Sequence, residues 1–201
     1  MLTRRTLLAA TAAGVALVAT APWRLAMAQG ADPTGFIVQL GTNMIGIVNG
    51  PGSYEEKKAR LAPVIEQAVD VDGIGQYCMG RYWRNASPDQ QRQFTQLFHT
   101  VLLNNIGGKI GQFQGVTFTP TTTMMREGDS LVGTIIRRPN QQPNNVQWVV
   151  STASSRPRII DVIAEGLSLR LTQRNDYSAF LSRNNGDVGA LINAMRQQVA
   201  G

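Results

Sequence analysis

Hydrophobic residues recur at helical spacing in the first half of the chain, and the spacing is clearest after Pro88. The apolar positions there lie three or four residues apart, the pattern of a helix that packs one face on a core; they are Phe94, Leu97, Phe98, Val101 and Leu102. Ser87 is suited to cap this helix, and Pro88 suits its first position. We therefore predict a helix from Pro88 to about Phe113.

The same spacing predicts further helices at residues 36–48, 53–69, 71–82, 169–183 and 188–199. Ser53 and Glu56 form a Ser-x-x-Glu capping box at the start of the second of these segments. Pro63 lies inside that segment, and we expect it to kink the helix or to divide it in two.

The period of the pattern changes between residues 115 and 164, which are rich in Val, Thr and Ile and interrupted by turn sequences. We predict strands at about 116–125, 130–138, 146–153 and 158–164. Short connections favour an antiparallel meander. Alternation places Val146, Trp148 and Val150 on one face of the third strand.

The order of helices, then sheet, then helices predicts an α+β fold. We expect a twisted antiparallel sheet of about four strands with helices packed on one face. The chain has 201 residues, of which 43% are hydrophobic and 16% charged, and this composition is typical of one globular domain. We assign that single domain to residues 29–201.

Residues 1–28 have the composition of an export signal. Arg4 and Arg5 precede an apolar run, and Ala26-Met27-Ala28 matches a cleavage signal. The apolar run is about 15 residues long, shorter than the roughly 20 that a membrane-spanning helix needs. We therefore expect export by the twin-arginine or the general route, cleavage near Ala28 and no permanent membrane anchor.

Removal of the signal would also lower the net charge. Arg4, Arg5 and Arg24 would be lost with no acidic residue, leaving 16 basic and 13 acidic residues, so that the charge falls from +6 to +3. The remaining basic residues are scattered rather than clustered, which argues against nucleic acid as a partner.

Candidate catalytic chemistry is sparse. His99 is the sole histidine and Cys78 the sole cysteine, and this excludes the usual zinc clusters and any disulfide within the chain. A packing role is favoured for His99, and a buried structural role for Cys78. Asp161 and Glu165 are more simply explained as acceptors for the start of the helix that follows them than as catalytic groups. We predict no catalytic residue, no metal and no cofactor, and therefore consider binding.

Two motifs, about eighty residues apart, resemble a known family. The first combines a Gly-x-Tyr-Trp turn at Gly80, a Ser-Pro-x-x-Gln helix start at Ser87 and the Phe94-x-x-x-Phe98 helix. The second is DVIAEGLSL at residues 161–169. Together they resemble the MlaC-type family of periplasmic lipid-binding proteins, also called toluene-tolerance or Ttg2-like proteins. Residues 172–174, 184–186 and 191–192 more closely resemble its hopanoid-associated, HpnM-like branch.

The resemblance implies a non-enzymatic periplasmic shuttle. It would carry phospholipid between an inner-membrane lipid ABC transporter complex and an outer-membrane lipoprotein complex, as an auxiliary component of the transporter. A carrier of hopanoid-type lipids is an alternative, and an envelope enzyme or a structural adaptor with a filled core is also left open.

In the family the acyl tails occupy an apolar cavity, which we expect between the sheet and its helices. The residues that we expect to line it are Tyr82, Trp83, Phe94, Phe98, Leu102, Phe113, Val116, Phe118, Met125, Trp148, Val150, Ile160, Val162, Tyr177 and Phe180. Basic side chains at its mouth would favour phosphate; the candidates are Arg81, Arg84, Lys109 and Arg170.

Overall fold

Helices occupy the first part of the chain in the computed structural model, which describes residues 32–108, 114–154 and 156–200. They are α1 (Pro33–Asn49), α2 (Tyr54–Ala68), α3 (Val71–Met79), α4 (Arg81–Asn85) and α5 (Pro88–Gly107). The strands β1 (Thr117–Arg126), β2 (Asp129–Arg137), β3 (Asn144–Ser151), β4 (Arg158–Ala164) and β5 (Leu167–Ser168) follow. The last elements are α6 (Leu169–Arg183) and α7 (Val188–Ala200). The predicted export signal lies outside the described residues.

The predicted capping sequences begin the helices. The Ser53 side chain accepts a hydrogen bond from the backbone N–H of Glu56, whose carboxylate accepts one from the Ser53 N–H at 2.7 Å. Ser87 and Gln90 form the same reciprocal pair at the start of α5. Pro63 lies inside α2, which continues through it, so of the two predicted outcomes the division does not occur, and the kink stays a prediction. Buried side chains on both sides of the proline hold the helix to the core and offset the missing backbone hydrogen bond.

Glycines set two helix ends. Gly80 has a positive φ of 53° and separates α3 from α4, so the predicted helix 71–82 is interrupted there. The helix α5 ends at Gly107, earlier than predicted, because Gly107 and Gly108 both have low helix propensity. Phe113 lies outside the described residues.

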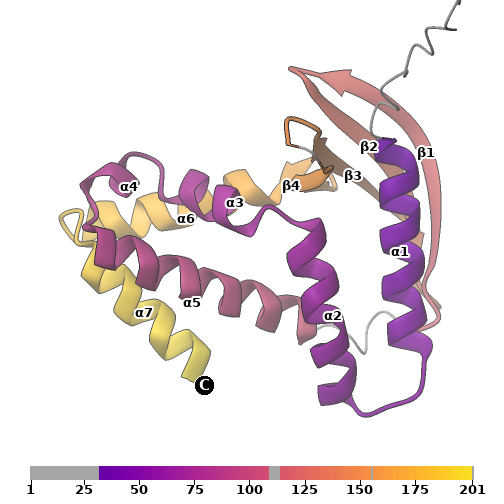
Figure 1. Cartoon of the computed structure of the whole chain (residues 1–201), viewed down its shortest axis with the longest axis horizontal. Helices are drawn as coiled ribbons and strands as arrows, with labels where there is room; N and C mark the ends of the chain where they lie inside the picture. The colour runs from indigo at the N-terminus through magenta and orange to yellow at the C-terminus, as the bar shows by residue number, and fades with distance from the viewer. Residues whose placement is uncertain (1–31, 109–113, 155, 201) are drawn as a thin grey trace, which may run out of the picture. The chain divides into compact units, whose positions relative to one another are not determined.

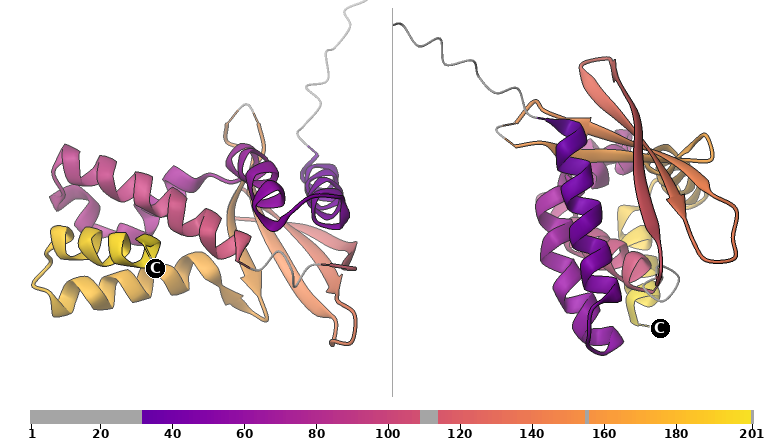
Figure 2. Two further views of the ribbon diagram at one scale, coloured as in Figure 1. Left: turned by 90° about the horizontal axis from the view of Figure 1, so that it is seen from below. Right: turned by 90° about the vertical axis from the view of Figure 1, so that its right-hand side faces the viewer.

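The sheet is an antiparallel meander in the order β1-β2-β3-β4-β5, as predicted except for the added two-residue β5. Val132, Trp148 and Val162 are directly paired across β2, β3 and β4, so they share one face. The helix α1 packs on β1 and β2, and α2 packs beside α1 and against β4 (Figures 1 and 2). The predicted α+β class with helices on a twisted antiparallel sheet is therefore confirmed.

Apolar side chains form three clusters. The helical cluster, which contains Phe94, joins α3, α4, α5, α6 and α7. The sheet cluster is made by Ile37, Leu40, Ala68, Val132, Val150 and Ile159. The α2 cluster is made by Val48, Leu61 and Ile65. Val69, directly after α2, packs against all three clusters and so lies at their junction.

Within the described residues, no helix is both long enough and apolar enough to cross a membrane.

Candidate functional site

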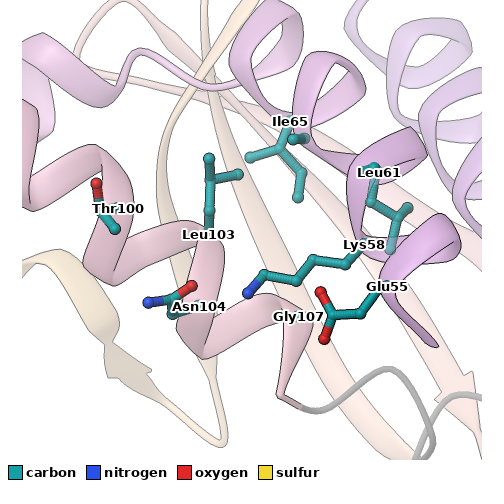
Figure 3. Close-up of a pocket in the computed structure, with 10 residues that line it drawn as sticks. Glu55, Lys58, Leu61, Ile65, Thr100, Leu103, Asn104 and Gly107 are labelled. Atoms are coloured by element: carbon teal, nitrogen blue, oxygen red, sulfur yellow. The ribbon is translucent and has the colours of Figure 1, made fainter. Parts of the chain in front are cut away.

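A cavity of about 290 Å³ lies between α2 and α5 and opens to solvent (Figure 3). The side contributed by α2 consists of Glu55, Lys58, Ala59, Leu61, Ala62 and Ile65. The side contributed by α5 consists of Thr100, Leu103, Asn104 and Gly107. The helical spacing along both segments brings these residues to two facing surfaces.

The floor of this cavity is apolar. Leu61 and Ile65 are buried members of the α2 cluster, and Leu103 packs against them from α5. Through Val69 this cluster adjoins both the sheet cluster and the helical cluster. The cavity floor is therefore continuous with the sheet cluster and the helical cluster.

The rim of the cavity is polar and carries both signs of charge. The side chains of Glu55, Lys58 and Asn104 lie around the opening (Figure 3). The Lys58 stem runs so close to Gly107 that a Cβ there would meet the lysine Cδ at 3.1 Å. The site thus combines an apolar floor with a charged rim, an arrangement that suits an amphipathic ligand.

The predicted lining residues from the helical region lie in the helical cluster. They are Tyr82, Trp83, Phe94, Phe98, Leu102, Tyr177 and Phe180. Phe94 is fully buried, stacks on Phe98 at 5.7 Å between ring centroids and meets Tyr177 edge-on at 5.8 Å. These rings fill space by packing on one another.

The predicted lining residues from the sheet are more dispersed. Phe118, Trp148, Val150 and Val162 belong to the sheet cluster, while Val116 is buried outside the three clusters. Ile160, also outside them, is half-buried at an irregularity in the β3–β4 pairing. Met125 is 67% exposed, because β1 is an edge strand that is open over most of its length.

None of these described residues lines the α2–α5 cavity. Their contact with a ligand stays a prediction.

Two titratable groups have structural partners. Burial raises the pKa of the Cys78 thiol to about 12, and its Sγ lies 3.6 Å from the carbonyl oxygen of Arg170. This is the inert buried thiol that its apolar neighbours predicted. His99 is half-buried and pairs through Nε2 with Oδ1 of Asp72 at 2.8 Å, in addition to its position beside the apolar stripe.

Asp161 has the structural role predicted for it. It is buried and accepts hydrogen bonds from the backbone N–H of Arg170 at 3.0 Å and from the Ser168 hydroxyl. Glu165 makes no such bond among the described residues, because it occupies the positive-φ turn before Gly166, and its predicted acceptor role is wrong. The described part of the chain also holds no group of three or more His, Cys, Asp or Glu residues placed to bind a metal ion.

Among the basic residues predicted at the cavity mouth, Arg81, Arg84 and Arg170 do not line the α2–α5 cavity, and Lys109 lies outside the described residues. The Arg170 guanidinium lies 4.2 Å from the Tyr77 ring centroid, and that of Arg81 lies 4.9 Å from the Tyr82 ring centroid. Lys58 and Glu55 at the rim were missed as site residues. Their three-residue spacing places them on one face of α2, but nothing local to that segment identifies α5 as the opposite wall.

Comparison with known proteins connects this architecture to a family. The family model described as MlaC protein matches residues 40–197. The toluene tolerance protein ttg2D of Pseudomonas putida is 26% identical over 150 residues, which cover 73% of this chain and 67% of that protein.

A solved structure supports the fold. The phospholipid-binding protein from Ralstonia solanacearum, determined in complex with a phospholipid, aligns with a TM-score of 0.75. The alignment has 21% sequence identity and covers 85% of this chain and 98% of that chain.

Proposed function

The chain belongs to the MlaC protein family, and from this premise we propose that it is a non-enzymatic periplasmic carrier of phospholipid. We place its ligand site at the α2–α5 cavity. The observation that carries the proposal is the combination, in one opening, of an apolar floor at Leu61, Ile65 and Leu103 with a charged rim at Glu55 and Lys58.

Acyl chains are the part of the ligand that would bind the floor. Each methylene withdrawn from water stabilises a complex by roughly 0.8 kcal/mol, so a hydrocarbon tail gains more from this surface than a headgroup gains from the rim. The polar headgroup would remain at the rim, close to solvent.

The size of the cavity implies that the site must widen. At about 290 Å³ it lies just below the range of roughly 300–1,000 Å³ typical of small-molecule sites. Two acyl chains would therefore require α2 and α5 to move apart. Because the floor adjoins the sheet and helical clusters, such a movement would expose further apolar surface to the tails.

The proposal also includes the membrane complexes with which the carrier exchanges lipid. We infer that the carrier exchanges lipid with an inner-membrane lipid ABC transporter complex and an outer-membrane lipoprotein complex, after export directed by residues 1–28. The phospholipid complex of the Ralstonia solanacearum protein supports phospholipid, rather than a hopanoid-type lipid, as the ligand.

Lipid content and lipid uptake test the carrier function. Protein purified from a native envelope is extracted and its lipids are identified by mass spectrometry, and delipidated protein is then mixed with vesicles containing a tail-labelled phospholipid. We expect about one lipid per protein and saturable uptake of the label. Protein that carries no lipid and takes up no label would contradict the proposal.

A further inference from the structure

Two opposite charges at the rim of the α2–α5 cavity have no partner among the described residues. Glu55 and Lys58 lie one turn apart on α2 and border the opening (Figure 3). The described part of the chain provides no hydrogen bond or ion pair to either side chain. The Lys58 stem is half-buried against Gly107, so its ammonium group is held at the opening.

The neighbouring charged residues on α2 are used by the protein itself. Glu56 caps the helix, the Lys57 ammonium donates to the carbonyl of Val48 at 2.8 Å, and Arg60 donates to the carbonyl of Pro51 at 2.6 Å. Between residues 55 and 60 of α2, Glu55 and Lys58 are thus the charged residues without a partner among the described residues, and both border the cavity. Their position, rather than the general charge of the surface, points to a ligand with both signs of charge.

We propose that Lys58 and Glu55 select the headgroup of a zwitterionic phospholipid that carries a primary amine. Lys58 donates to the phosphate, and Glu55 accepts from the headgroup ammonium; both bonds are charge-assisted. This assignment rests on the proposed function, because it requires the acyl chains to lie on the cavity floor. An anionic phospholipid that lacks the amine leaves Glu55 unpaired beside a negative charge, and this repulsion provides the discrimination.

Competing phospholipids with identical acyl chains test the assignment. Delipidated protein is titrated with vesicles of phosphatidylcholine that contain either tail-labelled phosphatidylethanolamine or tail-labelled phosphatidylglycerol. We expect the ethanolamine lipid to bind about two- to fivefold more tightly, the range of a partly exposed ion pair. Replacement Glu55→Gln should remove this preference, and Glu55→Lys should reverse it. Replacement Lys58→Gln should weaken the binding of both lipids, because both carry the phosphate.

A matched variant distinguishes the effect of a charge at the cavity rim from the effect of a charge elsewhere on α2. Glu66 is exposed on the same helix and does not line the cavity, so Glu66→Gln should retain the wild-type preference. Equal binding of the two lipids by the wild-type protein, or a preference that Glu55→Gln leaves unchanged, would overturn the assignment while the carrier function stands. Uptake of neither lipid would overturn both.

Discussion

Val69, the first residue after α2, forms a single parallel bridge with Ile159 of β4. Asp70, the next residue, adds a backbone hydrogen bond: its N–H donates to the Ile159 carbonyl at 2.9 Å. The C-terminal end of α2 is thereby fixed to the sheet. The N-terminal end of α2, which carries Glu55 and Lys58, is where the cavity opens, so widening of the cavity is expected to begin at that end.

Arg158 strengthens this attachment, and its removal should loosen α2. Its Nη2 donates to the carbonyl of Val69 at 2.7 Å and to that of Glu66 at 3.2 Å. Replacement Arg158→Ala should lower the free energy of unfolding by about 1.5–3 kcal/mol, as expected when hydrogen bonds to a charged group are lost. Urea unfolding measures the change. Arg156 is exposed and lies two residues before Arg158, so Arg156→Ala is the control. This replacement should alter stability by less than about 0.5 kcal/mol. Equal effects of the two replacements would contradict this role of Arg158.

A charge on the cavity floor should block lipid binding without unfolding the protein. Leu103 is half-buried and lines the cavity from α5. Replacement Leu103→Glu would place a carboxylate where the acyl chain lies, and a buried unpaired charge is costly. We expect lipid uptake to fall at least tenfold while the circular dichroism spectrum is retained. Asn105→Glu adds the same charge to an exposed position of the same helix and should leave uptake unchanged. Undiminished uptake by Leu103→Glu would exclude this cavity as the lipid site.

The elements that the sequence predicts well are those with local causes. Ser53 and Glu56 are three residues apart, and their capping box begins α2 as expected. Alternation placed Val146, Trp148 and Val150 on one face, and the pairing of β2 with β3 confirms it. Residues within a few positions of one another determine both features.

The cavity could not be predicted in the same way, because its walls come from segments far apart in the chain. Lys58 and Gly107 meet only after α2 and α5 have packed. An apolar stripe such as the one containing Phe94 is the same whether the space beside it is filled or empty. Met125 was expected in the lining because it is apolar, yet it lies on an exposed edge strand whose neighbours leave it uncovered.

The buried thiol of Cys78 should make stability depend on alkaline pH. Burial raises its pKa from an ordinary 9.0 to about 12, so the stability due to the neutral thiol is present below pH 9 and is lost as the pH rises toward 12. One such group contributes a slope of at most about 1.4 kcal/mol per pH unit. Urea unfolding of the wild type and of Cys78→Ala, measured from pH 8 to pH 11, should show a steeper loss in the wild type. Burial also raises the pKa of Tyr177, so the variant should retain a weaker dependence. Identical slopes would contradict the assignment to Cys78.

A larger side chain at Gly107 should close the α2–α5 cavity directly. Gly107 is buried where the Lys58 stem crosses α5, and even a Cβ there would come within 3.1 Å of the lysine Cδ. Leucine must therefore displace Lys58 and occupy the opening, while its higher helix propensity favours α5 by up to about 1 kcal/mol. We expect Gly107→Leu to keep or raise the melting temperature and to reduce lipid uptake severalfold. Asn105→Leu is the matched control at an exposed position of α5 and should take up lipid normally. If Gly107→Leu remained folded and bound lipid as the wild type does, acyl chains would have to enter the protein by a route other than the opening between α2 and α5.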